Sequence, residues 1–238
     1  RPFQSLRNRP GLVEDVGTVG GVSLKADGSA AVYDADGTIY TISTERDSVP
    51  EELLTGYDLP RYFGRDETRL LVRLPDGDLG LYDFATRDVF RLGAYRDALV
   101  LADGTLIAVG KPAANDVEGV YIVDATGAVP PLLLYGVPGG QIAVQVVTIA
   151  SGTVRVLVTG ADLAPIQTEV VDIAVNSGPV ALTPLGFNAQ PRLSSDGRFI
   201  VGMANASGLL AVRDLTSGRE ALHPLASQAL AIVWLRLR

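Results

Sequence analysis

Short turns built around glycine recur along this chain at intervals of about 42 residues. The first turn of each repeat contains Gly28, Glu67, Gly104, Gly152 or Gly197, which gives steps of 39, 37, 48 and 45 residues. Asp-Gly and Ser-Gly favour tight hairpins because glycine reaches positive φ without a Cβ clash. The spacing therefore predicts repeated four-stranded antiparallel units. Glu67 stands in a glycine position, so we expect a longer or type I turn there.

The clearest repeat runs from Gly186 to Leu225 and reads as four extended segments separated by three turns. A second marker is an aspartate after the third segment, followed within a few residues by Thr, Ser or Gly, as at Asp83, Asp124 and Asp214. Such an aspartate can cap its own turn through hydrogen bonds from its carboxylate to the backbone. The two markers together predict hairpin after hairpin along the chain.

The second segments of three repeats are apolar on both sides: 198–204, where neither set of alternate residues is polar after Arg198, 106–109, and 154–158 apart from Arg155. A strand with one solvated face alternates apolar and polar residues, so this pattern predicts sheets covered on both faces. We expect an all-β β-propeller of about five four-stranded antiparallel blades plus a partial sixth that closes it, begun by 229–238. Residues 18–238 form this domain, and 1–17 form an N-terminal extension or a closing strand near 11–16.

The sequences SSDGRFIVG, LLAVRDLTSGRE and LPDGDLGLYDFATRD resemble bacterial TolB-type, WD40-like β-propeller repeats. The resemblance covers about residues 18–225 and implies a propeller without specifying its function. Trp-Asp and Gly-His dipeptides are absent, so the structural tetrad of eukaryotic WD40 repeats is not implied. The resemblance also implies an extracytoplasmic location in bacteria, periplasmic or at the cell surface, with any membrane anchor outside this segment.

Charge and residue usage disfavour several classes of function. The net charge of −7 disfavours nucleic acid, and the absence of cysteine excludes thiolate chemistry. His223 is the only histidine and is expected on an outer strand, where a surface or structural role is the simpler reading. The acidic turns lack the downstream glutamate of a calcium loop, so solvated hairpin turns explain them. The chain has no facing carboxylate pair on its first segments and no membrane span, so we expect no enzyme, cofactor or metal.

One apolar segment suggests a contact with a protein partner. Leu132, Leu133, Leu134 and Tyr135 fall on the last strand of the third unit, predicted over 129–134, where half-solvated residues are expected. Alternatively, the loop 161–167 covers them. We expect a non-catalytic binding or scaffold module for a protein partner, with any small-molecule ligand left open. The alternative is an accessory or gating propeller of a larger hydrolase whose catalytic domain is absent from this chain.

Overall fold

The computed structural model describes residues 19–64, 66–113, 116–126, 128–160, 168–185, 187–204 and 209–223. Within these ranges the chain forms strands and turns, with no helix. The all-β class expected from the repeat is confirmed. The expected closing strand near 11–16 and the expected partial sixth blade at 229–238 lie outside the described residues.

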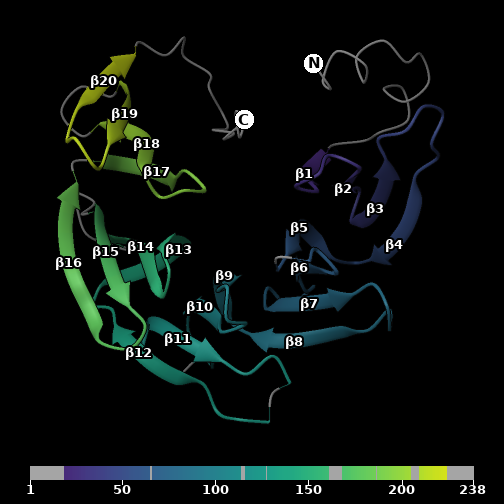
Figure 1. Cartoon of the computed structure of the whole chain (residues 1–238), viewed down its shortest axis with the longest axis horizontal. Coiled ribbons are helices and arrows are strands. Elements are labelled where there is room, and N and C mark those ends of the chain that lie inside the picture. Colours follow the sequence, from purple (N-terminus) through teal and green to yellow (C-terminus); the bar gives the residue numbers. More distant parts are fainter. Residues whose placement is uncertain are drawn as a thin grey trace. The chain divides into compact units, whose positions relative to one another are not determined.

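Consecutive strands pair into five four-stranded antiparallel sheets, one for each predicted repeat (Figure 1). The first sheet contains β1 (Val19–Leu24), β2 (Ala30–Ala35), β3 (Thr38–Ser43) and β4 (Glu51–Thr55). The second contains β5 (Asp58–Phe63), β6 (Arg69–Arg73), β7 (Leu79–Asp83) and β8 (Val89–Gly93). The third contains β9 (Tyr95–Val100), β10 (Leu106–Gly110), β11 (Gly119–Val123) and β12 (Leu132–Gly136). The fourth contains β13 (Gln141–Ala150), β14 (Thr153–Gly160), β15 (Thr168–Ala174) and β16 (Gly178–Leu185). The fifth contains β17 (Phe187–Leu193), β18 (Phe199–Ala204), β19 (Leu210–Asp214) and β20 (Glu220–His223).

The chain divides into two compact units, Arg1–Arg91 and Leu92–Arg238. The first unit holds the first two sheets, whose shared core joins Val32 and Ile39 to Leu70, Val72 and Tyr82. All five side chains are at most 3% exposed. The core of this unit therefore lies between the faces of two successive sheets.

The second unit holds the remaining three sheets, and strand β14 of the fourth sheet is buried on both faces. Val156 and Val158 belong to the apolar cluster shared with the third sheet, whereas Leu157 between them belongs to the cluster shared with the fifth. All three side chains are at most 1% exposed. Successive side chains of a strand point to opposite faces, so one strand contributes to two cores. The predicted two-sided burial of the second strand is confirmed for β14.

The first strand of every sheet carries a register irregularity against the second strand. In the third sheet Val109 pairs with Asp97 but Gly110 pairs with Tyr95, so Arg96 is an extra residue. A β-bulge of this kind bends its strand and redirects the neighbouring side chain. The sequence analysis did not predict these bulges.

The residue beside the bulge binds the next sheet. Asp97 is buried, and its Oδ2 accepts a hydrogen bond from the Val146 N–H at 2.9 Å. Gln145 occupies the same place in the fourth sheet, seven residues before the turn glycine, as Asp97 does in the third. Its Oε1 accepts from the Leu193 N–H at 2.8 Å, and its Nε2 donates to the Leu193 carbonyl at 3.0 Å. We call each such bond, from a side chain of one sheet to the backbone of the next sheet's first strand, a sheet latch.

The first sheet makes its latch from a different strand. Gly21 stands seven residues before Gly28, in the position that Asp97 holds in the third sheet. Here Asp34 of β2 supplies the carboxylate, and its Oδ2 accepts from the Leu59 N–H at 2.9 Å. A Cβ on Gly21 would lie 3.0 Å from that oxygen and 3.3 Å from the Leu59 Cα. The absence of a side chain at Gly21 therefore leaves room for the Asp34 carboxylate on the neighbouring strand.

Candidate interaction surface

The last strands of the third and fourth sheets carry no charged residue. The sequence has none between Asp124 and Arg155, a stretch that includes β12, and none between Asp172 and Arg192, a stretch that includes β16. The last strands of the other sheets all contain charges, as β4 does in Glu51. Strands β12 and β16 also contact each other. The second unit thus has two neighbouring uncharged edge strands.

The four residues predicted to bind a partner divide into two pairs. Leu132 and Leu133 are 60% and 42% exposed. Leu134 and Tyr135 are partly buried and pack against the core between the third and fourth sheets. Burial raises the pKa of Tyr135, and the nearby Glu169 carboxylate on β15 adds to the rise. Only the first pair is available for contact in this structure. The loop 161–167, proposed as a cover, lies outside the described residues.

Strand β12 begins later than predicted. The sequence suggested 129–134, whereas the strand runs from Leu132 to Gly136. Pro130 and Pro131 lack an N–H and cannot donate to a neighbouring strand, which delays the start of pairing. The shift brings Tyr135 into register with Val120.

Strand β16 is exposed along almost its whole length, on both faces, from residue 179 to 184. Val180 is 60% exposed and Leu182 is 54% exposed. Together with the exposed β12 edge they form what we call the uncharged outer surface, made of Val129, Leu132, Leu133, Val180 and Leu182. Exposed apolar side chains gathered on neighbouring strands commonly mark a contact with another molecule. The sequence analysis identified the β12 part of this surface and missed the β16 part, for which the absence of charge over 173–191 was the available signal.

In the acidic first turns of the repeats, the aspartate carboxylate caps the turn to which it belongs. In three of them the aspartate Oδ1 accepts the N–H two residues on: Asp27 at 2.8 Å, Asp103 at 2.9 Å and Asp196 at 3.0 Å. The backbone hydrogen bonds to Ser29 and Thr105 are the main causes that lower the pKa of Asp27 and Asp103. These carboxylates act in turn formation, as the sequence analysis favoured.

Glu67, which stands in a glycine position of the repeat, takes a φ of 52°, in the left-handed region that Gly28 occupies at 74°. Its carboxylate oxygens accept the Ala26 N–H at 2.8 and 3.0 Å. The side chain thus ties the first turn of the second sheet to the first turn of the first sheet, a bond that glycine could not make.

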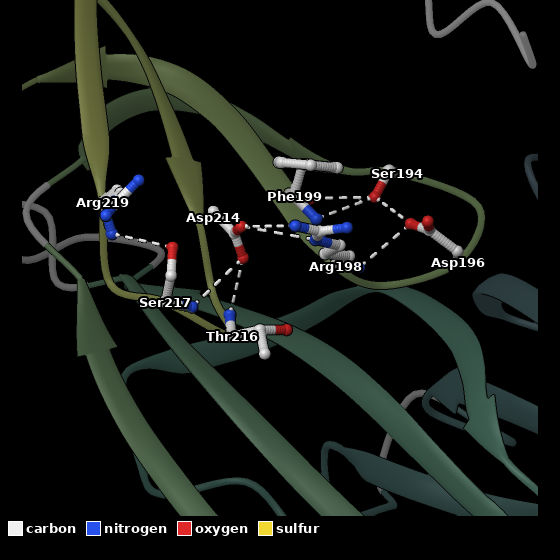
Figure 2. A network of polar contacts seen from close by, with 8 residues as sticks. All are labelled: Ser194, Asp196, Arg198, Phe199, Asp214, Thr216, Ser217 and Arg219. Atoms are coloured by element: carbon white, nitrogen blue, oxygen red, sulfur yellow. Dashed lines mark hydrogen bonds and ion pairs between the residues drawn. The ribbon is translucent and has the colours of Figure 1, made fainter.

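The aspartate after the third strand caps its turn as predicted (Figure 2). The Asp214 Oδ1 accepts the N–H groups of Thr216 at 2.9 Å and Ser217 at 3.3 Å. Its Oδ2 accepts from Arg198 of the preceding hairpin, with the nearer contact at 2.9 Å. The hydrogen bond from Arg198 is the main cause that lowers the pKa of Asp214 far below its ordinary value. In the second sheet Asp83 and Arg69 make the same pair at 3.1 Å.

A partly buried ion pair lies between the third and fourth sheets, and it was not predicted from the sequence. Glu118, 8% exposed, pairs with Arg96, the extra residue of the β9 bulge. The same carboxylate accepts the Ala143 N–H of β13 at 3.0 Å. Arg96 and Glu118 are 22 residues apart, and nothing in the local sequence pairs them. Since they bind the backbone of the next sheet, we assign them a structural role beside the Asp97 latch.

The remaining polar candidates do not gather into a reactive site. Within the described residues, no three His, Cys, Asp or Glu side chains come together as metal ligands. His223 is the last residue of β20, in register with Leu210, on the last strand of the fifth sheet as predicted. No helix in the described part of the chain has the length and apolarity to cross a bilayer.

Comparison with known proteins finds no matching family model and no match among curated proteins. Solved structures do match. The putative TolB from Agrobacterium tumefaciens superposes with a TM-score of 0.60 at 13% identity, over 87% of this chain and 80% of that chain. The Myceliophteria thermophila Cps50 (Swd1) β-propeller domain gives 0.55 at 12% identity, over 85% of this chain and 72% of that chain.

An oligogalacturonate lyase in complex with manganese gives a TM-score of 0.59 at 13% identity, over 90% of this chain. This chain spans 66% of the lyase chain, or about two thirds of its length. Identities this low carry information about fold rather than activity. The resemblance to TolB-type and WD40-like repeats is confirmed at that level, and the chain has a β-propeller fold with five four-stranded antiparallel blades.

Proposed function

We propose that this chain is a non-catalytic binding or scaffold module that holds a protein partner on the uncharged outer surface of its third and fourth blades. The observation that carries the proposal is the exposure of Leu132 and Leu182 on adjoining strands that contain no charge. Desolvating these side chains against a partner is favourable by about 25 cal/mol per Å² of buried apolar area. Strands β12 and β16 contain no charged residue that would have to be desolvated with these side chains.

Replacing Leu132 with aspartate tests the proposal. Leu132 is 60% exposed, so the variant is expected to fold, while the new carboxylate would have to be desolvated in a complex. We expect the purified variant to lose most of the partner that the unaltered chain binds in a quantitative pull-down followed by titration. Leu133→Asp is less suitable, because a Leu133 methyl group lies 2.7 Å from where a Cβ on Gly119 would be and so packs tightly.

Val49→Asp is the matched control. Val49 is 82% exposed and belongs to the first unit, so it is not part of the uncharged outer surface. Its variant adds the same charge and should keep full binding. Equal partner recovery by folded Leu132→Asp and Val49→Asp would reject the proposed surface.

The location proposed for this module is outside the bacterial cytoplasm. The support is the fold shared with the putative TolB together with the repeat motifs of that type. Fractionation of cells carrying the native gene, with the chain detected by antibody, tests this location. Recovery in the cytoplasmic fraction would reject it without bearing on the binding surface.

A further inference from the structure

The edge strand of a sheet carries unpaired N–H and C=O groups to which another strand can add. Proteins commonly prevent this addition with charged residues or proline on the edge. In the fifth sheet the Asp214 N–H donates to the Arg219 carbonyl. Every second residue of β19, counted back from Asp214, therefore directs its backbone N–H and C=O groups toward β20. Glu220 pairs with Arg213, which faces the other way, so the backbone of Glu220 points outward. A charge thus stands at the open edge of that sheet.

Strand β16 has no charge, and its outward positions follow from one hydrogen bond. The Val175 N–H donates to the Gly152 carbonyl at 2.9 Å, which directs Val175 toward β14. Backbone groups alternate in direction along a strand, so the odd-numbered residues of β15 face β14 and the even-numbered ones face β16. The β16 residues paired with odd-numbered residues therefore point outward, and these are Pro179, Leu182 and Pro184. Val180 is the extra residue of a register irregularity opposite Ile173 and has no such pairing.

Both prolines consequently lie where a missing N–H costs the sheet nothing. If the two prolines faced β15, two hydrogen bonds between β15 and β16 would be lost. For this reason proline within an edge strand is confined to positions that point outward. Of these three paired outward positions, only Leu182 keeps an N–H that could bind an added strand. Residues 179–184 of β16 are exposed, and the paired outward positions offer one N–H donor between two prolines. The irregularity at Val180 also interrupts this edge, and a bulge of this kind opposes strand addition as well.

We propose that Pro179 and Pro184 close β16 to strand addition while keeping it free of charge, so that its apolar side chains receive a partner through side-chain contacts alone. The partner's contact surface is accordingly apolar and uncharged. A charge such as Glu220 would block strand addition equally well, but it would also have to be desolvated in the complex. That a protein partner contacts β16 rests on the proposed function. The closure of the β16 edge to strand addition does not depend on it.

Restoring the missing donors tests the closure. The double variant Pro179→Thr, Pro184→Val offers three outward N–H groups in strand-favouring residues. Sedimentation over a range of protein concentrations should show self-association of this variant beyond that of the unaltered chain. Adding Leu182→Lys to it should reverse the association, because a lysine on the edge opposes pairing.

Pro50→Thr is the matched control for this experiment. Pro50 precedes β4, whose edge keeps Glu51 and Glu52, so this variant should sediment as the unaltered chain does. A folded proline-free variant that sediments in the same way at every concentration would overturn the closure.

Amide hydrogen exchange tests the same assignment in the unaltered protein. The Leu182 N–H should exchange with solvent faster than those of Ala181 and Thr183, which face β15. Protection of Leu182 equal to that of its neighbours would mean that another strand, including one from a second copy, pairs with β16, and the proposal would fail.

Titration with the partner identified in the pull-down tests the occupant. Leu182→Lys should weaken binding by about tenfold or more, as expected for a charge placed in an apolar contact. The proline-free double variant, measured below its association concentration, should bind within about twofold of the unaltered chain. Unchanged binding by Leu182→Lys would remove β16 from the contact. If Leu132→Asp also left binding unchanged, the proposed function itself would fail, while the sedimentation result would stand.

Discussion

At the scale of single residues, the sheets are connected by side chains that bind backbone groups of the neighbouring sheet. Asp34, Asp97, Glu118 and Gln145 all act in this way, and each is bonded to an N–H of the next sheet's first strand. A buried backbone N–H that loses its acceptor costs about 1–3 kcal/mol. These polar contacts therefore influence stability out of proportion to their small number.

Asp97→Ala should lower the free energy of unfolding by about 1–3 kcal/mol, because the Val146 N–H would remain buried without its carboxylate. Asp97→Asn keeps an acceptor oxygen and should cost less. Urea unfolding followed by circular dichroism would give both values. Equal losses for the two variants would show that the charge, rather than the acceptor, matters at this latch.

Asp214→Asn should change how stability depends on pH. Because its pKa is lowered in the folded protein, Asp214 stabilises the fold above its unfolded value of 3.8, and this contribution is lost as pH falls through the folded value. The stability difference between the unaltered chain and Asp214→Asn should thus be largest at neutral pH and shrink below about pH 4. Urea midpoints measured across the acid range would detect the trend, and a constant difference would contradict it.

At the scale of strands, the sequence identified nearly all elements, because turn glycines and apolar runs are local signals. Each predicted repeat forms one four-stranded sheet, and β12 is displaced from its predicted bounds by the adjacent prolines. The bulges were not predictable in this way, since an extra residue such as Arg96 is defined only by its pairing with another strand. The same holds for the surface, because periodicity alone could not separate exposed Leu132 from half-buried Leu134.

Leu134→Asp and Leu132→Asp should behave differently although the residues are two apart. Leu134 packs against the core between the third and fourth sheets, so its aspartate variant should be destabilised by several kcal/mol, as expected for a carboxylate forced into an apolar contact. Leu132→Asp should remain within about 1 kcal/mol of the unaltered chain. Thermal unfolding of the two variants would check this, and equal melting temperatures would contradict the strand orientation.

At the scale of the whole molecule, the repeat length and two-sided burial were sufficient to predict stacked four-stranded sheets. The proposed binding surface was less accessible to sequence reasoning, because it depends on which strands lie beside one another, as β12 and β16 do. Fold similarity at 13% identity likewise informs on architecture and not on ligand. Function in this molecule must be argued from its surface.

Truncating Val156 and Leu157 separately should test how the three sheets of the second unit depend on one another. The two residues are adjacent on β14 but serve different cores. Leu157→Ala should cost about 2–5 kcal/mol, and Val156→Ala somewhat less. If the unit unfolds cooperatively, hydrogen exchange will accelerate to the same degree in β10 and β18 for either variant. Acceleration confined to the nearer sheet would show that the sheets open separately.

A sheet latch binds the main chain of its neighbour, so the side chain carried by the receiving residue is irrelevant to the bond. Leu59, Val146 and Leu193 could each be exchanged for other residues while the donated N–H remained in place. Successive repeats are thereby released from having to evolve in step, and each can drift in sequence as long as it keeps its own latch residue. Such a chain can diverge until its repeats are barely alike and still transmit the same spacing from one sheet to the next.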